Sequence, residues 1–125
     1  MEIPEDLLYT EEHEWVYIEG DVGIIGITDY AQAELGDVVF VELPHVGDHI
    51  QQMEPFGSIE AVKTVSDLFA PVSGEVIEVN TNLENNPQLI NQDPYGEGWI
   101  IKVKLSNMKQ TEELITADDY HNLIE

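Results

Sequence analysis

The stretch GSIEAVKTVSD, residues 57–67, places a single lysine, Lys63, between two short runs that mix apolar, β-branched and polar residues. Val, Ile and Thr are common in strands, and alternation of apolar with polar residues is typical of a strand that buries one face. We therefore predict a strand over residues 57–63 that ends at or next to Lys63.

The segments on the two sides of Lys63 repeat one pattern. VFVELPHVGDHI at 39–50 precedes the lysine, and GEVIEVNTNLENNPQLI at 74–90 follows it. Each consists of an alternating strand, a turn and a returning apolar position. Such half-repeats predict a mainly β fold: a flattened, hammerhead-like sandwich of two antiparallel sheets, joined by an exposed hairpin that carries Lys63 at or near its tip.

The remaining elements follow from local signals. Strands are predicted at 15–18 and 22–27 around a Gly-containing turn, and WIIKVKL at 99–105 is a further strand. Thr28 or Asp29 can cap a short helix near 29–35 that Gly36 ends.

Two later segments differ in character. TNLENNPQLINQDPYGEG at 81–98 is rich in turn residues, so we predict a loop. Residues 111–125 are predicted to be helical, with Thr116 as a cap and with Tyr120, Leu123 and Ile124 on one side. The length of 125 residues suits one domain spanning 1–125.

Charge restricts the partners. The chain has 26 acidic side chains against four lysines and no arginine, for a formal net charge of -22. Phosphate backbones and anionic membrane surfaces would be repelled, so we expect no nucleic acid and no membrane as partners. Protein partners should present basic faces, and so large a charge favours a monomer.

The sequence also bears on location and redox chemistry. It has no apolar run of membrane-spanning length, and its first residues lack a basic signal-peptide start, so we expect a cytoplasmic protein. It contains no cysteine. Any sulfur redox chemistry must therefore be supplied by a cofactor.

Lys63 is the main candidate for function. An exposed lysine is ordinarily a solvated surface charge. Lys63 is set apart because Lys102, Lys104 and Lys109 cluster late in the chain, whereas Lys63 stands alone at the junction of the half-repeats. A primary amine on a long stem at a rigid tip suits amide attachment of a prosthetic arm.

Several long blocks are similar to one known family. They are YTEEHEWV at 9–16, GITDYAQAELGDVVFVELPHVG at 26–47, SIEAVKTVSDLFAPVSGEVIEVN at 58–80 and NPQLINQDPYGEGWIIKVK at 86–104. In order and spacing they resemble the H-protein of the glycine cleavage system. The resemblance implies that lipoate is covalently attached to Lys63, within the pattern formed by Glu60, Val62, Lys63 and Ser66.

The resemblance also implies the partners and the role. The lipoyl arm would accept an aminomethyl group from glycine decarboxylase, the P-protein, and deliver it to the aminomethyltransferase, the T-protein. Dihydrolipoyl dehydrogenase, the L-protein, would reoxidise the dithiol, and a lipoate ligase or lipoyl transferase would attach the arm. The chain itself would be a carrier and not an enzyme, with no catalytic residue.

A surface cleft that shelters the loaded arm is a further implication. Glu14 and Asp67 stand at matching positions and would attract the cationic end of the arm. Glu12 replaces a residue that is often Ser in the family, and its carboxylate joins them as a cleft candidate. Ala61 likewise stands where Ser is frequent. We expect His13 to serve in packing or hydrogen bonding.

Other interpretations remain open. A biotinyl domain usually flanks its lysine with methionines, where this chain has Val62 and Thr64. The lipoyl domain of a 2-oxo acid dehydrogenase acyltransferase lacks the EHEW and NQDPYGEGW blocks. There are two more alternatives. One is an unmodified acidic interaction module, and the other is an H-like protein that relays lipoyl groups to other enzymes. The pattern HVGDH at 45–49 could suggest a metal, but its turn residues do not align ligands, and we expect none.

Overall fold

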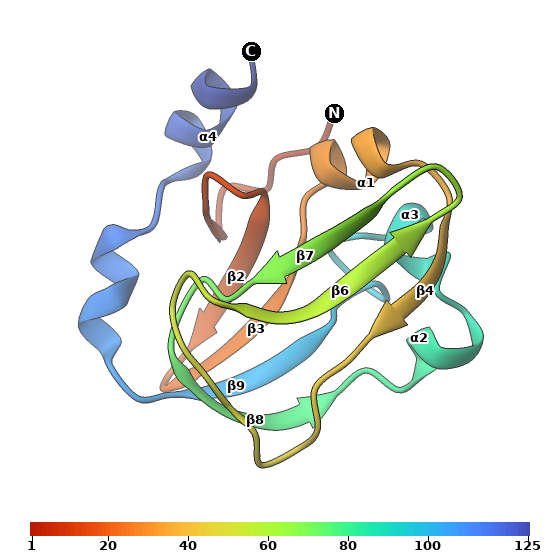
Figure 1. The fold of residues 1–125 in the computed structure, drawn as a ribbon. Coiled ribbons are helices and arrows are strands. Elements are labelled where there is room, and N and C mark those ends of the chain that lie inside the picture. Colours follow the sequence, from red (N-terminus) through yellow and green to blue (C-terminus); the bar gives the residue numbers. More distant parts are fainter.

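The computed structural model describes residues 1–125, which form two antiparallel sheets stacked as a sandwich (Figure 1). The larger sheet has six strands in the order β1 (Leu8–Tyr9), β2 (Glu14–Glu19), β3 (Val22–Ile27), β9 (Ile101–Leu105), β8 (Gly74–Val79) and β5 (His49–Ile50). The smaller has three in the order β4 (Val38–Glu42), β6 (Pro55–Ala61) and β7 (Val65–Phe69). The predicted fold class is confirmed.

One apolar core fills the space between the sheets. The larger sheet contributes Ile25, Val76 and Val103, and the smaller contributes Ile59 and Leu68, all with exposed fractions of 2% or less. Each such side chain stabilises the fold by about 1.5–3 kcal/mol when fully buried. The alternation read in the sequence therefore reflects one face of each strand packed against the opposite sheet.

The first helix, α1 (Asp29–Leu35), begins and ends at the predicted residues. Thr28 is its N-cap, and the Thr28 hydroxyl accepts a hydrogen bond from the Ala31 amide at 3.1 Å. Gly36 ends the helix with a φ of 80°, a left-handed conformation that favours glycine. This cap turns the chain directly into β4.

The prediction of a loop over 81–98 is wrong in part. Two single-turn helices, α2 (Asn82–Asn85) and α3 (Leu89–Gln92), lie within it. Each buries one side chain, Leu83 with 1% exposure and Ile90 with none. A four-residue helix is too short to show helical periodicity, and tertiary burial of these two side chains decides the structure.

The prediction of a helix over 111–125 is also wrong in its first half. The 3₁₀ helix η1 (Met108–Glu113) is followed by extended chain, because Ile115 pairs with Tyr9 through two main-chain hydrogen bonds of 2.9 Å. Only α4 (Ala117–Ile124) is α-helical, with Thr116 as its cap. Tyr120 is fully buried on it, but Leu123 is 48% exposed and does not share the buried face.

The hairpin β6–β7 extends from the sandwich toward the corner between α1 and β4, where its tip lies in Figure 1. The Val62 amide donates a hydrogen bond of 3.0 Å to the Asp37 carbonyl, and the Ala61 amide donates one of 2.8 Å to the Thr64 carbonyl. The turn that contains Lys63 is therefore fixed to the body of the molecule by its main chain. None of the helices has the length and apolar character needed to cross a membrane.

Candidate functional site

Lys63 lies in the tight turn between β6 and β7, and its side chain is exposed. Its ammonium forms none of the salt bridges or hydrogen bonds in the structure, and its stem runs beside Gly36, where a Cβ atom would lie 3.3 Å from Lys63 Cε. The amine can therefore be acylated without loss of any structural contact. This arrangement fits the covalent attachment of a lipoyl group.

A cleft of about 140 Å³ lies between α1, the hairpin β6–β7 and the loop that leads into β2. It brings together all three cleft candidates, Glu12, Glu14 and Asp67. Its floor and walls include the apolar side chains Ile27, Ala31, Leu35, Ile59 and Leu68. The cleft thus combines an apolar interior with several carboxyl groups.

Glu14 is the buried carboxyl of this cleft, with an exposed fraction of 2%. The Thr10 hydroxyl lies 2.7 Å from Glu14 Oε1, and the Phe69 amide donates to Glu14 Oε2 at 3.3 Å. Burial raises the pKa of Glu14 to about 8, although these two hydrogen bonds oppose the shift. At neutral pH the Glu14 side chain is therefore mainly a neutral carboxylic acid.

Asp67 and Glu12 differ from Glu14 because both side chains are exposed. They lie on different elements: Asp67 is in β7, opposite Ser58 of β6, and Glu12 is in the turn before β2. The cleft therefore has one buried carboxyl group and exposed carboxyl groups at its edge.

His13 has a φ of 73°, which is uncommon for a residue other than glycine. Its Nδ1 lies 2.9 Å from the Tyr120 hydroxyl, and its ring packs against those of Tyr30 and Tyr120. Burial lowers the pKa of His13, although Glu12 and Glu34 act against this. His13 lines the cleft as a neutral ring and connects it to α4.

Sequence reasoning missed two residues of the cleft region. Glu34, on α1, adds a carboxyl group to the lining. Thr10 does not line the cleft, but its hydroxyl forms a hydrogen bond with Glu14. Glu34 follows Ala31 by three residues and therefore lies on the same face of the predicted helix, and this spacing could have indicated Glu34 from the sequence. Thr10 had none, because its contact with Glu14 depends on a turn closed by the Thr10 amide and the Glu14 carbonyl.

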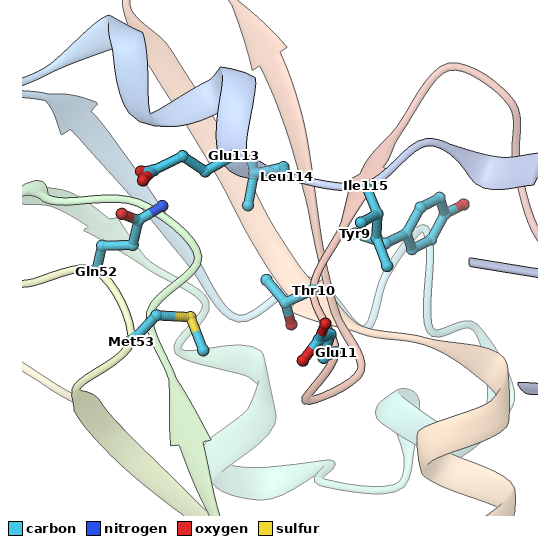
Figure 2. A pocket seen from close by; sticks show the side chains of 8 residues that line it. All are labelled: Tyr9, Thr10, Glu11, Gln52, Met53, Glu113, Leu114 and Ile115. Carbon is cyan, nitrogen blue, oxygen red and sulfur yellow. The ribbon is translucent and has the colours of Figure 1, made fainter. Parts of the chain in front are cut away.

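A second cavity, of about 180 Å³, is lined in part by Thr10, the residue that hydrogen-bonds to Glu14 (Figure 2). Tyr9, Thr10 and Glu11 line it from the amino-terminal segment, Gln52 and Met53 from the turn before β6, and Glu113, Leu114 and Ile115 from the carboxy-terminal segment. It contains none of the residues that the sequence singled out. No group of three or more His, Cys, Asp or Glu side chains in the structure is placed to hold a metal ion.

The chain matches known proteins over nearly its whole length. The family model described as "Glycine cleavage H-protein" matches residues 7–125. A glycine cleavage system H protein of Symbiobacterium thermophilum is 60% identical over 118 residues, which cover 94% of this chain and 92% of the relative. One of Carboxydothermus hydrogenoformans is 55% identical over 123 residues, covering 98% of this chain and 95% of the relative.

A solved structure agrees with these matches. The crystal structure of a glycine cleavage system H protein from Mycobacterium marinum superposes with a TM-score of 0.89 at 44% sequence identity, covering 96% of this chain and 97% of that one. Sequence and fold therefore give the same answer, and this chain belongs to the glycine cleavage H-protein family.

Proposed function

We propose that this chain carries a lipoyl group in amide linkage on Lys63 and serves as the non-catalytic carrier of the glycine cleavage system. The observation that carries the proposal is the position of Lys63: an exposed amine without polar partners, on a turn fixed by the main chain, next to an acidic cleft. Membership of the H-protein family supports the same role.

The lipoyl group would supply a disulfide that takes up a one-carbon amine unit from glycine decarboxylase (P-protein), passes it to the aminomethyltransferase (T-protein) and is restored by dihydrolipoyl dehydrogenase (L-protein). A tether makes each transfer effectively intramolecular once a partner has docked. The chain's own contribution is to hold Lys63 at a fixed point and to offer a sheltered site nearby.

Glu14, Asp67 and Glu12 would form that sheltered site. A protonated amine is attracted to carboxylates, and the attraction is stronger where apolar walls exclude water. The cleft has such walls, formed by Ile59 and Leu68 among others. Glu14 would receive the amine at the buried end, while Asp67 and Glu12 would attract it from the edge.

Intact mass of the chain purified from lipoate-replete cells tests the attachment. We expect one lipoyl group per chain, located by fragment mapping to Lys63, and none in Lys63→Arg, because a guanidinium is not acylated. Lys104→Arg is the matched control, since Lys104 is also exposed but lies in strand β9 and not at the hairpin tip, and it should keep the modification. An unmodified wild-type chain would contradict the proposal.

Reconstitution with purified P-, T- and L-proteins tests the role. We expect glycine cleavage with the lipoylated chain and none with Lys63→Arg. A lipoylated chain that fails to support glycine cleavage but donates its lipoyl group to other enzymes would favour the relay alternative.

A further inference from the structure

The edge strand β4 turns two consecutive apolar side chains toward solvent. Val38 pairs with Ala61 of β6, and Phe40 pairs with the preceding residue, Glu60, so Val39 is an extra residue in the ladder. This bulge leaves Val39 46% exposed and Phe40 57% exposed, while Val38 on one side remains buried. A β-bulge is a common device for re-aiming side chains near functional sites.

The exposed apolar side chains continue to the hairpin tip. Glu60, opposite Phe40, is itself opposite Val65 of β7, so these three lie in one row across the small sheet. Val65 is 63% exposed, and Val62, next to Lys63, is 75% exposed. We call Val39, Phe40, Val62 and Val65 the tip patch. It lies beside the amine that the proposed function uses.

The fold does not require an aromatic side chain at this position. Strand β8, in the second half-repeat, has the same irregularity, since its register against β9 shifts between Val76 and Glu78. There the two outward residues are Ile77 and Glu78, and Glu78 forms a salt bridge of 3.3 Å with Lys102. A charged side chain is thus compatible with this bulge in β8. The bulge alone therefore does not explain why β4 exposes an aromatic side chain, Phe40.

The surroundings of the tip patch indicate the chemistry of what covers it. Glu42 and Glu60 are exposed on β4 and β6, and Asp37 is exposed just before β4. Glu60 lies between Phe40 and Val65, so the tip patch combines apolar side chains with a carboxylate. Apart from Lys63, the lysines lie in β9, on the other sheet, and in η1. Such a surface is complementary to an enzyme surface that has apolar recesses next to Lys and Arg.

Geometry selects one enzyme among the partners. Enzymes that act on the far end of the arm can stand away from Lys63 by the length of the side chain plus its acyl chain. An enzyme that acylates Lys63 must bring its reacting carbonyl to within bonding distance of Nζ, so it must contact Val62 and the neighbouring β4. The tip patch is therefore best placed for the acylating enzyme.

We propose that the tip patch, formed by the β4 bulge and the hairpin tip, is the docking surface for the enzyme that acylates Lys63. This inference rests on the proposed function. In the step concerned, Nζ forms an amide bond with the carboxyl carbon of a lipoyl adenylate, and the carbon–oxygen bond to the phosphate breaks. AMP leaves with that electron pair, and the amine loses a proton to a base or to water.

The test compares rates of acylation of the unmodified full chain by a purified lipoate ligase supplied with lipoate, ATP and Mg²⁺, followed by intact mass. The double variant V39T/F40T keeps residues that favour strands but removes the aromatic ring. We expect its kcat/KM to fall about tenfold or more, mainly through KM, because a central apolar anchor typically dominates an interface. V62T, which lies in a turn, should lower kcat/KM in the same direction.

The matched controls are I77T, at the equivalent bulge of β8, and V46T, whose side chain is 64% exposed in the turn after β4. Both should stay within about twofold of wild type. Thermal unfolding of each variant checks the fold. A second readout is the rate of reduction of the lipoylated chains by dihydrolipoyl dehydrogenase supplied with NADH, which should change by less than about twofold in V39T/F40T.

Each outcome has one meaning. Acylation of V39T/F40T and V62T at the wild-type rate would overturn the docking surface and leave the proposed function intact. An equal fall in acylation and in reduction would also overturn it, because the tip patch would then serve every partner. If the wild-type chain is not acylated at all, the proposed function fails and the docking surface fails with it.

Discussion

Glu14 shows how the fold controls the charge of a single carboxyl group. Burial keeps this side chain mainly protonated at neutral pH, since its pKa is raised to about 8. A cation that enters beside it favours the ionised form, so the proton should leave as the cation binds. The cleft would therefore exchange a proton for an ammonium ion, with no net burial of charge.

Binding of methylammonium to the chain should depend on pH for this reason. With a pKa of about 8, only about a tenth of Glu14 is ionised at pH 7, so the apparent affinity should be about tenfold weaker at pH 7 than at pH 9. Calorimetry in buffers of different ionisation enthalpy counts the released proton. Glu14→Gln should abolish the release, whereas Glu11→Gln, outside the cleft, should preserve it. Equal affinity at both pH values would contradict the exchange.

The same group makes stability depend on pH. The pKa of Glu14 is raised from 4.5 to about 8 on folding, so its contribution to stability is fully present below pH 4.5 and is lost as pH rises through 8. Relative to Glu14→Gln, wild type should lose up to about 5 kcal/mol of unfolding free energy across this window. Urea unfolding of both proteins at pH 5, 7 and 9 gives the difference in unfolding free energy between them, and a difference that stays constant with pH would contradict the prediction.

Among the elements, α4 supports the cleft although none of its residues lines it. Tyr120 on α4 is fully buried, stacks on Tyr9 with ring centroids 4.7 Å apart, and has its hydroxyl 2.7 Å from the Thr28 hydroxyl and 2.9 Å from His13 Nδ1. A neutral His13 can accept a hydrogen bond from the Tyr120 hydroxyl at Nδ1, while the Thr28 hydroxyl donates one to the Tyr120 oxygen. The helix thereby ties the α1 cap to the loop that leads to Glu14.

Tyr120→Phe should weaken this connection without opening a cavity. Loss of buried hydrogen bonds should lower the unfolding free energy by about 1–3 kcal/mol, and amide exchange should quicken at His13 and along α4. Tyr17→Phe serves as the control because the Tyr17 hydroxyl has no hydrogen bond in the structure, and it should change stability by less than about 0.5 kcal/mol. Unchanged exchange at His13 would show that α4 does not support the cleft.

Elements were predictable from sequence where local chemistry decides them. Thr28 and Gly36 mark the ends of α1 because a side-chain cap and a left-handed glycine act within a few residues. In contrast, α2 and α3 form around Leu83 and Ile90, which reach a core built by strands far away in the chain. The break before α4 likewise depends on a bridge between Ile115 and Tyr9 that no local pattern announces.

For the whole molecule, the dominant property is a formal net charge of -22. Such a field accelerates encounters with basic partners, and salt screens it over a length of about 10 Å at 0.1 M ionic strength. For P-protein, a partner in the proposed function, the association rate should therefore fall about tenfold or more between 0.02 and 0.5 M NaCl, with a smaller change in the dissociation rate. Stopped-flow measurements would give the association rate at each salt concentration, and a rate that does not depend on salt would exclude electrostatic steering.

At the scale of the whole molecule, some parts of the candidate site were predictable from the sequence and others were not. The position of Lys63 at a hairpin tip follows from the half-repeats, but its attachment chemistry came only from the family resemblance. Glu12, Glu14 and Asp67 meet because the loop before β2 and strand β7 face α1 in the folded chain. The exposed bulge of β4 was not predictable from the sequence, since Val39 and Phe40 belong to a segment that the pattern indicates as an ordinary alternating strand.

The hydrogen bond from Val62 to Asp37 has a consequence for the range of the proposed lipoyl arm. Because it holds the backbone on one side of Lys63, movement of a group attached to Lys63 would begin at the lysine's own torsions. The accessible space would then be a volume around one fixed point, limited outward by the extended length of the side chain and its acyl chain. Any enzyme that uses the arm would have to place its active site within that radius, so the distance between docking site and active site would have the same upper limit in otherwise unrelated enzymes.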